Sequence, residues 1–140
     1  MAALTQNYEA DEKRGEIVAY AVGQNKDIFK GALVVMDDTG GYAEPGTDAT
    51  GKTFLGVAYE RADNNPGSAG AVTVRVRKTG SYVYNFSGTW GQAAVGKKAY
   101  IVDDNTVALA ATTTNDVNCG DIVGLEGTGK VRVRIDRAAG

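Results

Sequence analysis

The sequence predicts an all-β fold, either an antiparallel β-sandwich of jelly-roll type or a small barrel. Three observations lead to this prediction. Short segments rich in Val, Tyr and Thr recur along the chain, and residues 72–77 alternate apolar and polar side chains with a period of two. The chain has 19 glycines and only 2 prolines, a composition that suits tight turns between short strands. No window carries the apolar stripe of an amphipathic helix.

The first fifteen residues form a separate region, polar and mixed in charge, which we expect to be an extended arm. Such an arm either frays in solution or becomes ordered on a partner, and the sequence leaves both possibilities open. If it becomes ordered, Leu4 and Tyr8 are its candidate anchors. Residues 16–140 are expected to form a single all-β domain.

The expected strands are short apolar or alternating runs, and most are bounded by Gly, Asn or Asp. In chain order they are Ile17–Val22, Ile28–Met36, Thr53–Tyr59, Val72–Arg77, Ser81–Phe86, Ala99–Val102, Thr106–Ala110, Asp121–Leu125 and Val131–Ile135. Short strands that follow one another in this way are typical of sandwiches and barrels.

An internal repeat divides the strand region into two similar β-units. The segment Ala32–Asp38 resembles Ala99–Asp104, and each half ends in Val-Arg-Val-Arg. A glycine also interrupts an apolar strand in each half, Gly56 in the first and Gly124 in the second. We therefore expect two copies of one unit, each burying a sheet face that the other leaves exposed.

Length, charge and cysteine content limit the classes of function. A chain of 140 residues can bury a core without metal or disulfide staples. The net charge of −2 gives no global attraction to nucleic acid or to anionic membranes. Cys119 is the only cysteine, which suits a reducing cytoplasm, and we interpret it as a small filler. The first residues have neither the basic nor the apolar region of a signal peptide, and no apolar run is long enough to span a bilayer.

One motif imitates a nucleotide-binding loop. Residues Gly46–Thr53 match the P-loop pattern letter for letter. A P-loop also needs a buried strand before it and a helix that begins at its lysine. The flanking segments Gly41–Pro45 and Phe54–Tyr59 provide neither, so we interpret the motif as a glycine-rich hairpin loop.

Two acidic clusters, Asp37-Asp38 and Asp103-Asp104-Asn105, invite a calcium interpretation. Calcium takes six to eight oxygen ligands, whereas adjacent side chains of a strand point to opposite faces. Asp and Asn are also the residues that tight turns favour, and this explains both clusters better than calcium binding.

The chain has no histidine and no pair of cysteines, so the usual sets of residues for nucleophilic, acid–base or metal catalysis are missing. We expect neither an enzyme nor a cofactor nor a small-molecule substrate.

Exposed arginines and an aromatic residue are the candidate contacts to a partner. The repeated strands place Arg75, Arg77, Arg132 and Arg134 opposite their valines, and these would form one basic stripe if the two strands were neighbours. Such residues either pair with local acids in a solvated face or meet an acidic protein surface. Trp90 lies between two glycines in an expected loop, and core and interface positions remain open for it.

The strand region as a whole resembles the phage capsid decoration, or cement, proteins. The resemblance rests on Lys30–Val35, Phe54–Ala58, Ala71–Val74, Gly96–Ile101, Asp121–Gly124 and Val131–Ile135. It implies a structural protein of the virion, made in the cytoplasm of a bacterial host. Such a protein binds the outer surface of an assembled head as a dimer or trimer and clamps neighbouring major capsid protein subunits, without nucleic acid or membrane partners. The alternatives are a β-module of a phage tail or baseplate, and a small carbohydrate-binding β-domain that uses Trp90 and tyrosines.

Overall fold

The structure, a computed structural model, describes residues 3, 5–7, 15–136 and 138. These residues form twelve strands and one short 3₁₀ helix, so the predicted all-β fold is confirmed. The first unit contains β1 (Ile17–Ala21), β2 (Asp27–Ile28), β3 (Leu33–Asp37), β4 (Ala43–Pro45), β5 (Lys52–Ala58), β6 (Ala62–Asp63) and β7 (Thr73–Arg77). The second contains β8 (Ser81–Ser87), η1 (Gln92–Ala94), β9 (Lys98–Asp103), β10 (Thr106–Ala108), β11 (Asn118–Leu125) and β12 (Lys130–Arg134).

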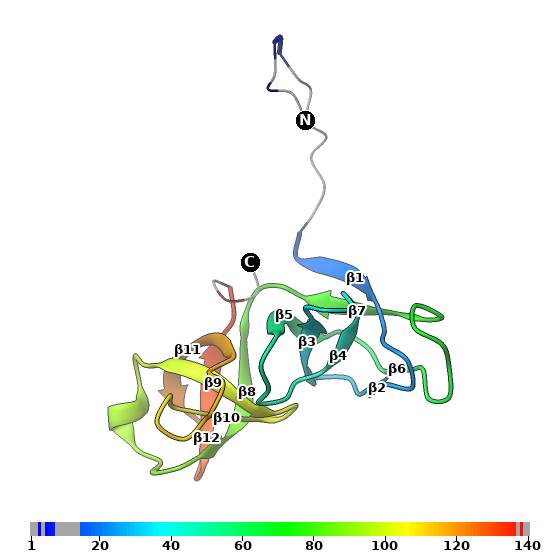
Figure 1. Cartoon of the computed structure of the whole chain (residues 1–140). Coiled ribbons are helices and arrows are strands. Elements are labelled where there is room, and N and C mark those ends of the chain that lie inside the picture. The colour runs from blue at the N-terminus through cyan, green and yellow to red at the C-terminus, as the bar shows by residue number, and fades with distance from the viewer. Residues whose placement is uncertain (1–2, 4, 8–14, 137, 139–140) are drawn as a thin grey trace.

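The two units lie side by side and share one topology (Figure 1). The first is a five-stranded sheet in the order β1-β7-β5-β3-β4, and β2 pairs with β6 beside it. The second is a closed barrel in which β8, β12, β11, β9 and β10 follow one another in the equivalent order. Its pairing is antiparallel except where β10 runs parallel to β8 and closes the barrel. A single parallel bridge, Val22 to Ala43, stands at the corresponding place in the first unit.

The predicted repeat is therefore present as a repeat of strand order, with one correction to its alignment. Gly56 corresponds to Gly120 and not to Gly124, because each of the first two directly precedes the residue that pairs with the last arginine of its repeated tetrapeptide, Val57 with Arg77 and Asp121 with Arg134. Both have a positive φ, of 148° and 142°. At each position a Cβ would collide with a carbonyl oxygen, that of Arg77 or that of Arg134, so only glycine fits this close approach of two strands.

One expected strand is divided in the structure. The run predicted as Ile28–Met36 forms β2 and β3, which are separated by a turn at residues 29–32. Gly31 adopts a φ of 87°, and the Ala32 amide donates to the Phe29 carbonyl. An apolar run alone does not reveal such a turn, because the glycine that permits it is a single residue. Strands β4 and β6 were likewise not expected from the sequence.

The apolar core joins the two units. One cluster of buried side chains fills the first unit and includes Val34, Leu55, Val74 and Val76. The other fills the barrel and also takes in side chains from the opposite face of β3 and β5, which are Leu33, Val35, Phe54 and Val57. The sheet of the first unit thus packs one face into its own core and the other against the barrel.

Candidate functional site

The two predicted anchors of the arm, Leu4 and Tyr8, lie outside the described residues. The four predicted arginines are described and do alternate with buried valines on β7 and β12. However, β7 pairs with β1 and β5, whereas β12 pairs with β8 and β11. The two strands are not neighbours, so the basic stripe that adjacent strands would have made does not form.

Arg75 and Arg77 belong to a local cluster around Tyr59. The two guanidinium carbons lie 5.0 Å and 4.5 Å from the centre of the Tyr59 ring, within cation–π range. Arg75 also forms a bidentate ion pair with Glu60, with its shortest contact at 2.7 Å. Its hydrogen bond lowers the pKa of the Glu60 carboxyl and raises the pKa of Arg75 itself. This part of the surface is a solvated, internally paired face.

On β12, Arg134 approaches the carboxylate of Asp136 at 3.6 Å, and the guanidinium of Arg132 lies beside Gly124. Both arginines are exposed. Trp90 lies in the loop before η1 with 37 % of its surface exposed, and its indole N–H donates to the Lys130 carbonyl at 2.9 Å. That bond fixes the ring beside the beginning of β12.

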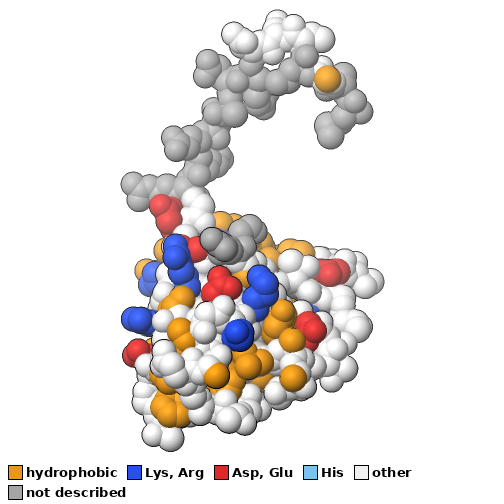
Figure 2. Space-filling view, turned by 90° about the vertical axis from the view of Figure 1, so that its left-hand side faces the viewer, with side chains coloured by type: hydrophobic (Ala, Val, Ile, Leu, Met, Phe, Trp, Pro, Cys, Tyr) orange, Lys and Arg blue, Asp and Glu red, His pale blue; other side chains and the backbone are white. Residues whose placement is uncertain are grey.

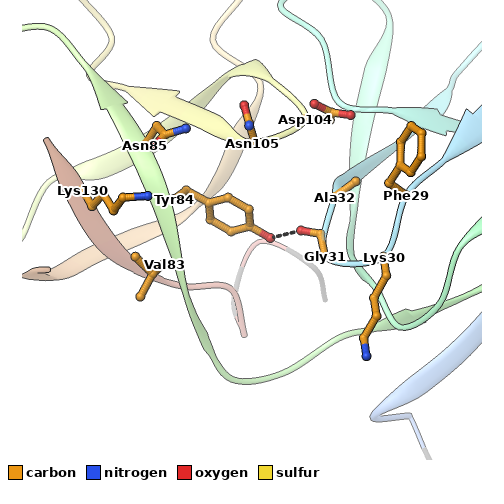
Figure 3. A pocket seen from close by; sticks show the side chains of 10 residues that line it. All are labelled: Phe29, Lys30, Gly31, Ala32, Val83, Tyr84, Asn85, Asp104, Asn105 and Lys130. Atoms are coloured by element: carbon orange, nitrogen blue, oxygen red, sulfur yellow. Dashed lines mark hydrogen bonds between the residues drawn. The ribbon is translucent and has the colours of Figure 1, made fainter. Parts of the chain in front are cut away.

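A surface pocket of about 430 Å³ opens at the junction of the two units (Figure 3). We call it the junction pocket. One wall is the turn at residues 29–32 between β2 and β3, and the other is formed by β8, the β9–β10 turn and the beginning of β12. Its side chains include Phe29, Lys30, Val83, Tyr84, Asn85, Asp104, Asn105 and Lys130.

Tyr84 connects the two walls of the junction pocket. Its hydroxyl donates to the carbonyl oxygen of Gly31 at 2.8 Å, across the boundary between the units (Figure 3). Burial of the ring raises the pKa of its phenol above the ordinary value of 10.0, so this hydroxyl remains a donor at every ordinary pH. The two walls are therefore joined by a buried aromatic side chain whose hydroxyl is hydrogen-bonded.

Two exposed apolar side chains border the junction pocket. Phe29 is 54 % exposed and Val83 is 48 % exposed, which makes them the most exposed large apolar residues of the described chain. The ring of Phe29 lies 4.7 Å from the guanidinium carbon of Arg61, which is held in turn by Asp27 at 2.7 Å. Exposed apolar surface beside polar groups is common at sites of protein contact.

Charged groups line the same pocket. In Figure 3 the Lys130 ammonium points towards the space beside Tyr84, and Asp104 stands across from it above Gly31. Burial, with a smaller contribution from the neighbouring Asp103, raises the pKa of the Asp104 carboxyl. Within the described part of the chain, neither Lys30 nor Lys130 forms an ion pair.

The P-loop-like segment has a different structural context. Lys52 begins strand β5, at the place where a nucleotide-binding loop would begin a helix. Its ammonium contacts Glu44 at 2.6 Å and Asp37 at 3.7 Å. The hydrogen bond to Glu44 raises the pKa of Lys52, so the charge that would meet a phosphate is already paired.

The acidic clusters take part in turns, as the sequence indicated. Asp37 accepts a hydrogen bond from the Thr39 amide, and Asp103 accepts one from the Asn105 amide. Over the described ranges, no three His, Cys, Asp or Glu side chains gather as a metal site. Cys119 is fully buried in the barrel, and burial raises the pKa of its thiol to about 12.

Comparison with known protein families, with curated proteins and with solved structures finds no match. The function of the chain therefore has to be inferred from its own surface.

Figure 2 shows the barrel end of the molecule. Hydrophobic side chains gather in the lower half of this face, with charged groups among and above them. No helix of the described residues is long and apolar enough to cross a membrane.

Sequence reasoning names Asp104 and Asn105 only as a turn cluster and does not single out Phe29, Val83 or Lys130 as candidate site residues. The apolar run predicts Phe29 inside a strand, and Val83 lies in the strand expected over Ser81–Phe86. The useful signal was the Lys30-Gly31 step, since a glycine inside an apolar run often marks a turn. That Val83 faces the same space follows only from the packing of the units.

Proposed function

We propose that this protein is a capsid decoration protein, a structural component that binds the outer surface of an assembled phage head and clamps neighbouring major capsid protein subunits. Binding as a dimer or trimer is part of this proposal. The resemblance of the strand region to the cement proteins supports it, and so does the surface described above. The observation that matters most is the pair of exposed apolar side chains, Phe29 and Val83, beside a rigid junction.

The construction of the molecule suits mechanical clamping. Two β-units share buried side chains across their junction, and Tyr84 and Asp48 add hydrogen bonds between them. A scaffold of this kind loses little conformational entropy when it attaches to a surface. When many copies bind one shell, their individually modest contacts add up to a large stabilisation of that shell.

The carbohydrate-binding alternative draws less support from the site. It required Trp90 and tyrosines to line a pocket, but Trp90 is not among the residues of the junction pocket. The polar ends of Trp90 and Tyr84 are both engaged within the chain, with the carbonyls of Lys130 and Gly31. The indole of Trp90 has no further hydrogen to donate to a sugar hydroxyl, and the Tyr84 hydroxyl could only accept a hydrogen bond from one.

The test is cosedimentation of the purified protein with expanded heads that lack decoration. We expect saturable binding with a fixed number of copies per head, and decorated heads that resist heat better than bare heads. A tail or baseplate module would instead show no affinity for heads. Binding to a glycan array that is lost in Trp90→Ala would favour the carbohydrate alternative.

A further inference from the structure

We infer that the junction pocket is the docking site for an extended segment of the shell protein, in which a carboxylate side chain stands beside an apolar one. This inference rests on the proposed function and names the partner's chemistry at one site. Three features of the pocket lead to it: a strand edge that no described strand covers, exposed apolar walls, and a lysine without an ion pair among the described residues.

The open edge belongs to the first half of β8. The Phe86 amide donates at 2.8 Å to the carbonyl of Gly129, which directly precedes β12. The backbone amides and carbonyls of the alternate residues Tyr84 and Tyr82 therefore also face β12. The backbone groups of Asn85 and Val83 therefore point to the opposite side. There, Asn85 donates to the carbonyl of Asn105 at 3.1 Å, because β10 covers Asn85–Ser87.

The backbone of Val83 is left facing the junction pocket. Within the described chain no strand pairs with β8 on that side before Asn85. An extended peptide can bond to such an edge through its main chain while its side chains enter neighbouring pockets. The edge is short, so the side-chain contacts must provide much of the specificity.

The apolar walls fit one large apolar side chain of the segment. Phe29 stands on one side of the pocket and Val83 on the other (Figure 3). The Arg61–Asp27 pair holds the Phe29 ring in place, and the Tyr84–Gly31 hydrogen bond fixes the two walls relative to each other. A site built in advance lowers the entropic cost of binding.

The charge of the pocket favours a carboxylate. Lys130 points into it without an ion pair among the described residues, and Lys30 stands on the rim and points away. Asp104 and Asn85 also line the pocket and are half-buried, and the carboxylate of the first and the amide of the second can form hydrogen bonds with a peptide backbone. Lys52, by contrast, is already neutralised by Glu44 and Asp37.

The first experiment compares substitutions inside and outside the pocket in head-binding assays. Val83→Asp and Lys130→Glu are expected to weaken binding to undecorated heads at least tenfold. Their matched controls on the same barrel are Val123→Asp, at an apolar residue that is 38 % exposed on β11, and Lys98→Glu on β9. The controls should remain within about twofold of the wild type. Equal effects at pocket and control positions would overturn the inference.

A second measurement does not depend on the folding of any variant. We expect the Val83 amide to exchange quickly with solvent deuterium in the free protein and to become protected on heads. The Ile17 amide is the internal control, because it faces the open edge of β1 and should not change. Protection at Ile17 without protection at Val83 would place the contact elsewhere. Failure of the wild type to bind heads would instead overturn the proposed function itself.

Discussion

At the scale of single residues, two glycines determine how closely the strands of each unit approach. Gly56 and Gly120 occupy equivalent positions with large positive φ, and each faces a backbone carbonyl across the strand pair. A side chain there would have to displace main-chain atoms, which a packed sheet cannot move cheaply. These glycines are therefore required for the close approach of two strands, in the five-stranded sheet at Gly56 and in the barrel at Gly120.

Replacement of Gly120 by alanine is expected to lower the free energy of unfolding by about 3 kcal/mol, since backbone strain and overpacking act together. Urea denaturation followed by circular dichroism measures this loss. Gly91→Ala is the control, because Gly91 has an extended φ of 171° and no atom of the described residues lies within 4 Å of the position that a Cβ would take. It should change stability by less than about 0.5 kcal/mol. Equal effects at the two positions would contradict the close-approach explanation.

At the scale of elements, a carboxylate joins the loops of the two units. Asp48 lies in the β4–β5 loop and accepts hydrogen bonds from the amides of Thr114 and Asn115, both at 2.9 Å. The side-chain amide of Asn115 adds a bond to the Asp48 carbonyl at 3.1 Å. The Thr114 amide is the main cause that lowers the pKa of the Asp48 carboxyl below 3.8.

This lowered pKa leads to a prediction about pH. A carboxyl whose pKa is lower in the folded state than in the unfolded state stabilises the fold at pH values above the unfolded-state pKa. That contribution is lost as the pH falls through the folded-state pKa. Asp48→Asn is therefore expected to cost about 1 kcal/mol near neutral pH and progressively less below the ordinary pKa of 3.8. Thermal unfolding of both proteins from about pH 7 to about pH 2.5 measures the difference.

The control for the pH series is Asp121→Asn. Its carboxylate makes no hydrogen bond or ion pair with another described residue, so the substitution should change the free energy of unfolding by less than about 0.5 kcal/mol near neutral pH. A loss for Asp48→Asn that stays constant down to about pH 2.5 would show that the charge of Asp48 contributes nothing. The contact between the two loops would then depend on packing and uncharged hydrogen bonds, and not on the charge of the carboxylate.

At the scale of the whole molecule, the two units are expected to unfold as one. Phe54 belongs to the first unit but packs with the buried side chains of the barrel, and only 5 % of its surface is exposed. Phe54→Ala should cost about 3–5 kcal/mol, because a large cavity remains at the junction. Since Trp90 is the only tryptophan and lies in the second unit, its fluorescence reports on the unit that was not mutated.

The test is whether the unfolding midpoints reported by two spectroscopic probes shift by the same amount. Circular dichroism follows strands of both units, and Trp90 fluorescence follows the second, so both midpoints should shift by the same amount in Phe54→Ala. Val123→Ala, at an exposed position of the barrel, should leave them within about 0.5 kcal/mol of the wild type. A fluorescence midpoint that stays at the wild-type value would mean that the units unfold independently.

The all-β class, most strands and the existence of a repeat can be predicted from the amino-acid sequence alone. These features are local: the period of two on Val74–Arg77, and the Gly, Asn and Asp residues at turns, act within a few residues of each other. The Asx turns at Asp37 and Asp103 were predictable for the same reason.

Which strands are neighbours and which surfaces meet depends instead on tertiary packing. The repeated tetrapeptides of β7 and β12 look like one basic stripe in the sequence, yet they lie in different sheets. Likewise Phe29 and Val83, far apart in the chain, border one pocket because the Tyr84–Gly31 contact sets the position of one unit on the other. Strand pairing and the packing of the two units bring distant residues together because their surfaces fit and bury apolar area. A pattern within a few residues of sequence contains no information about that fit.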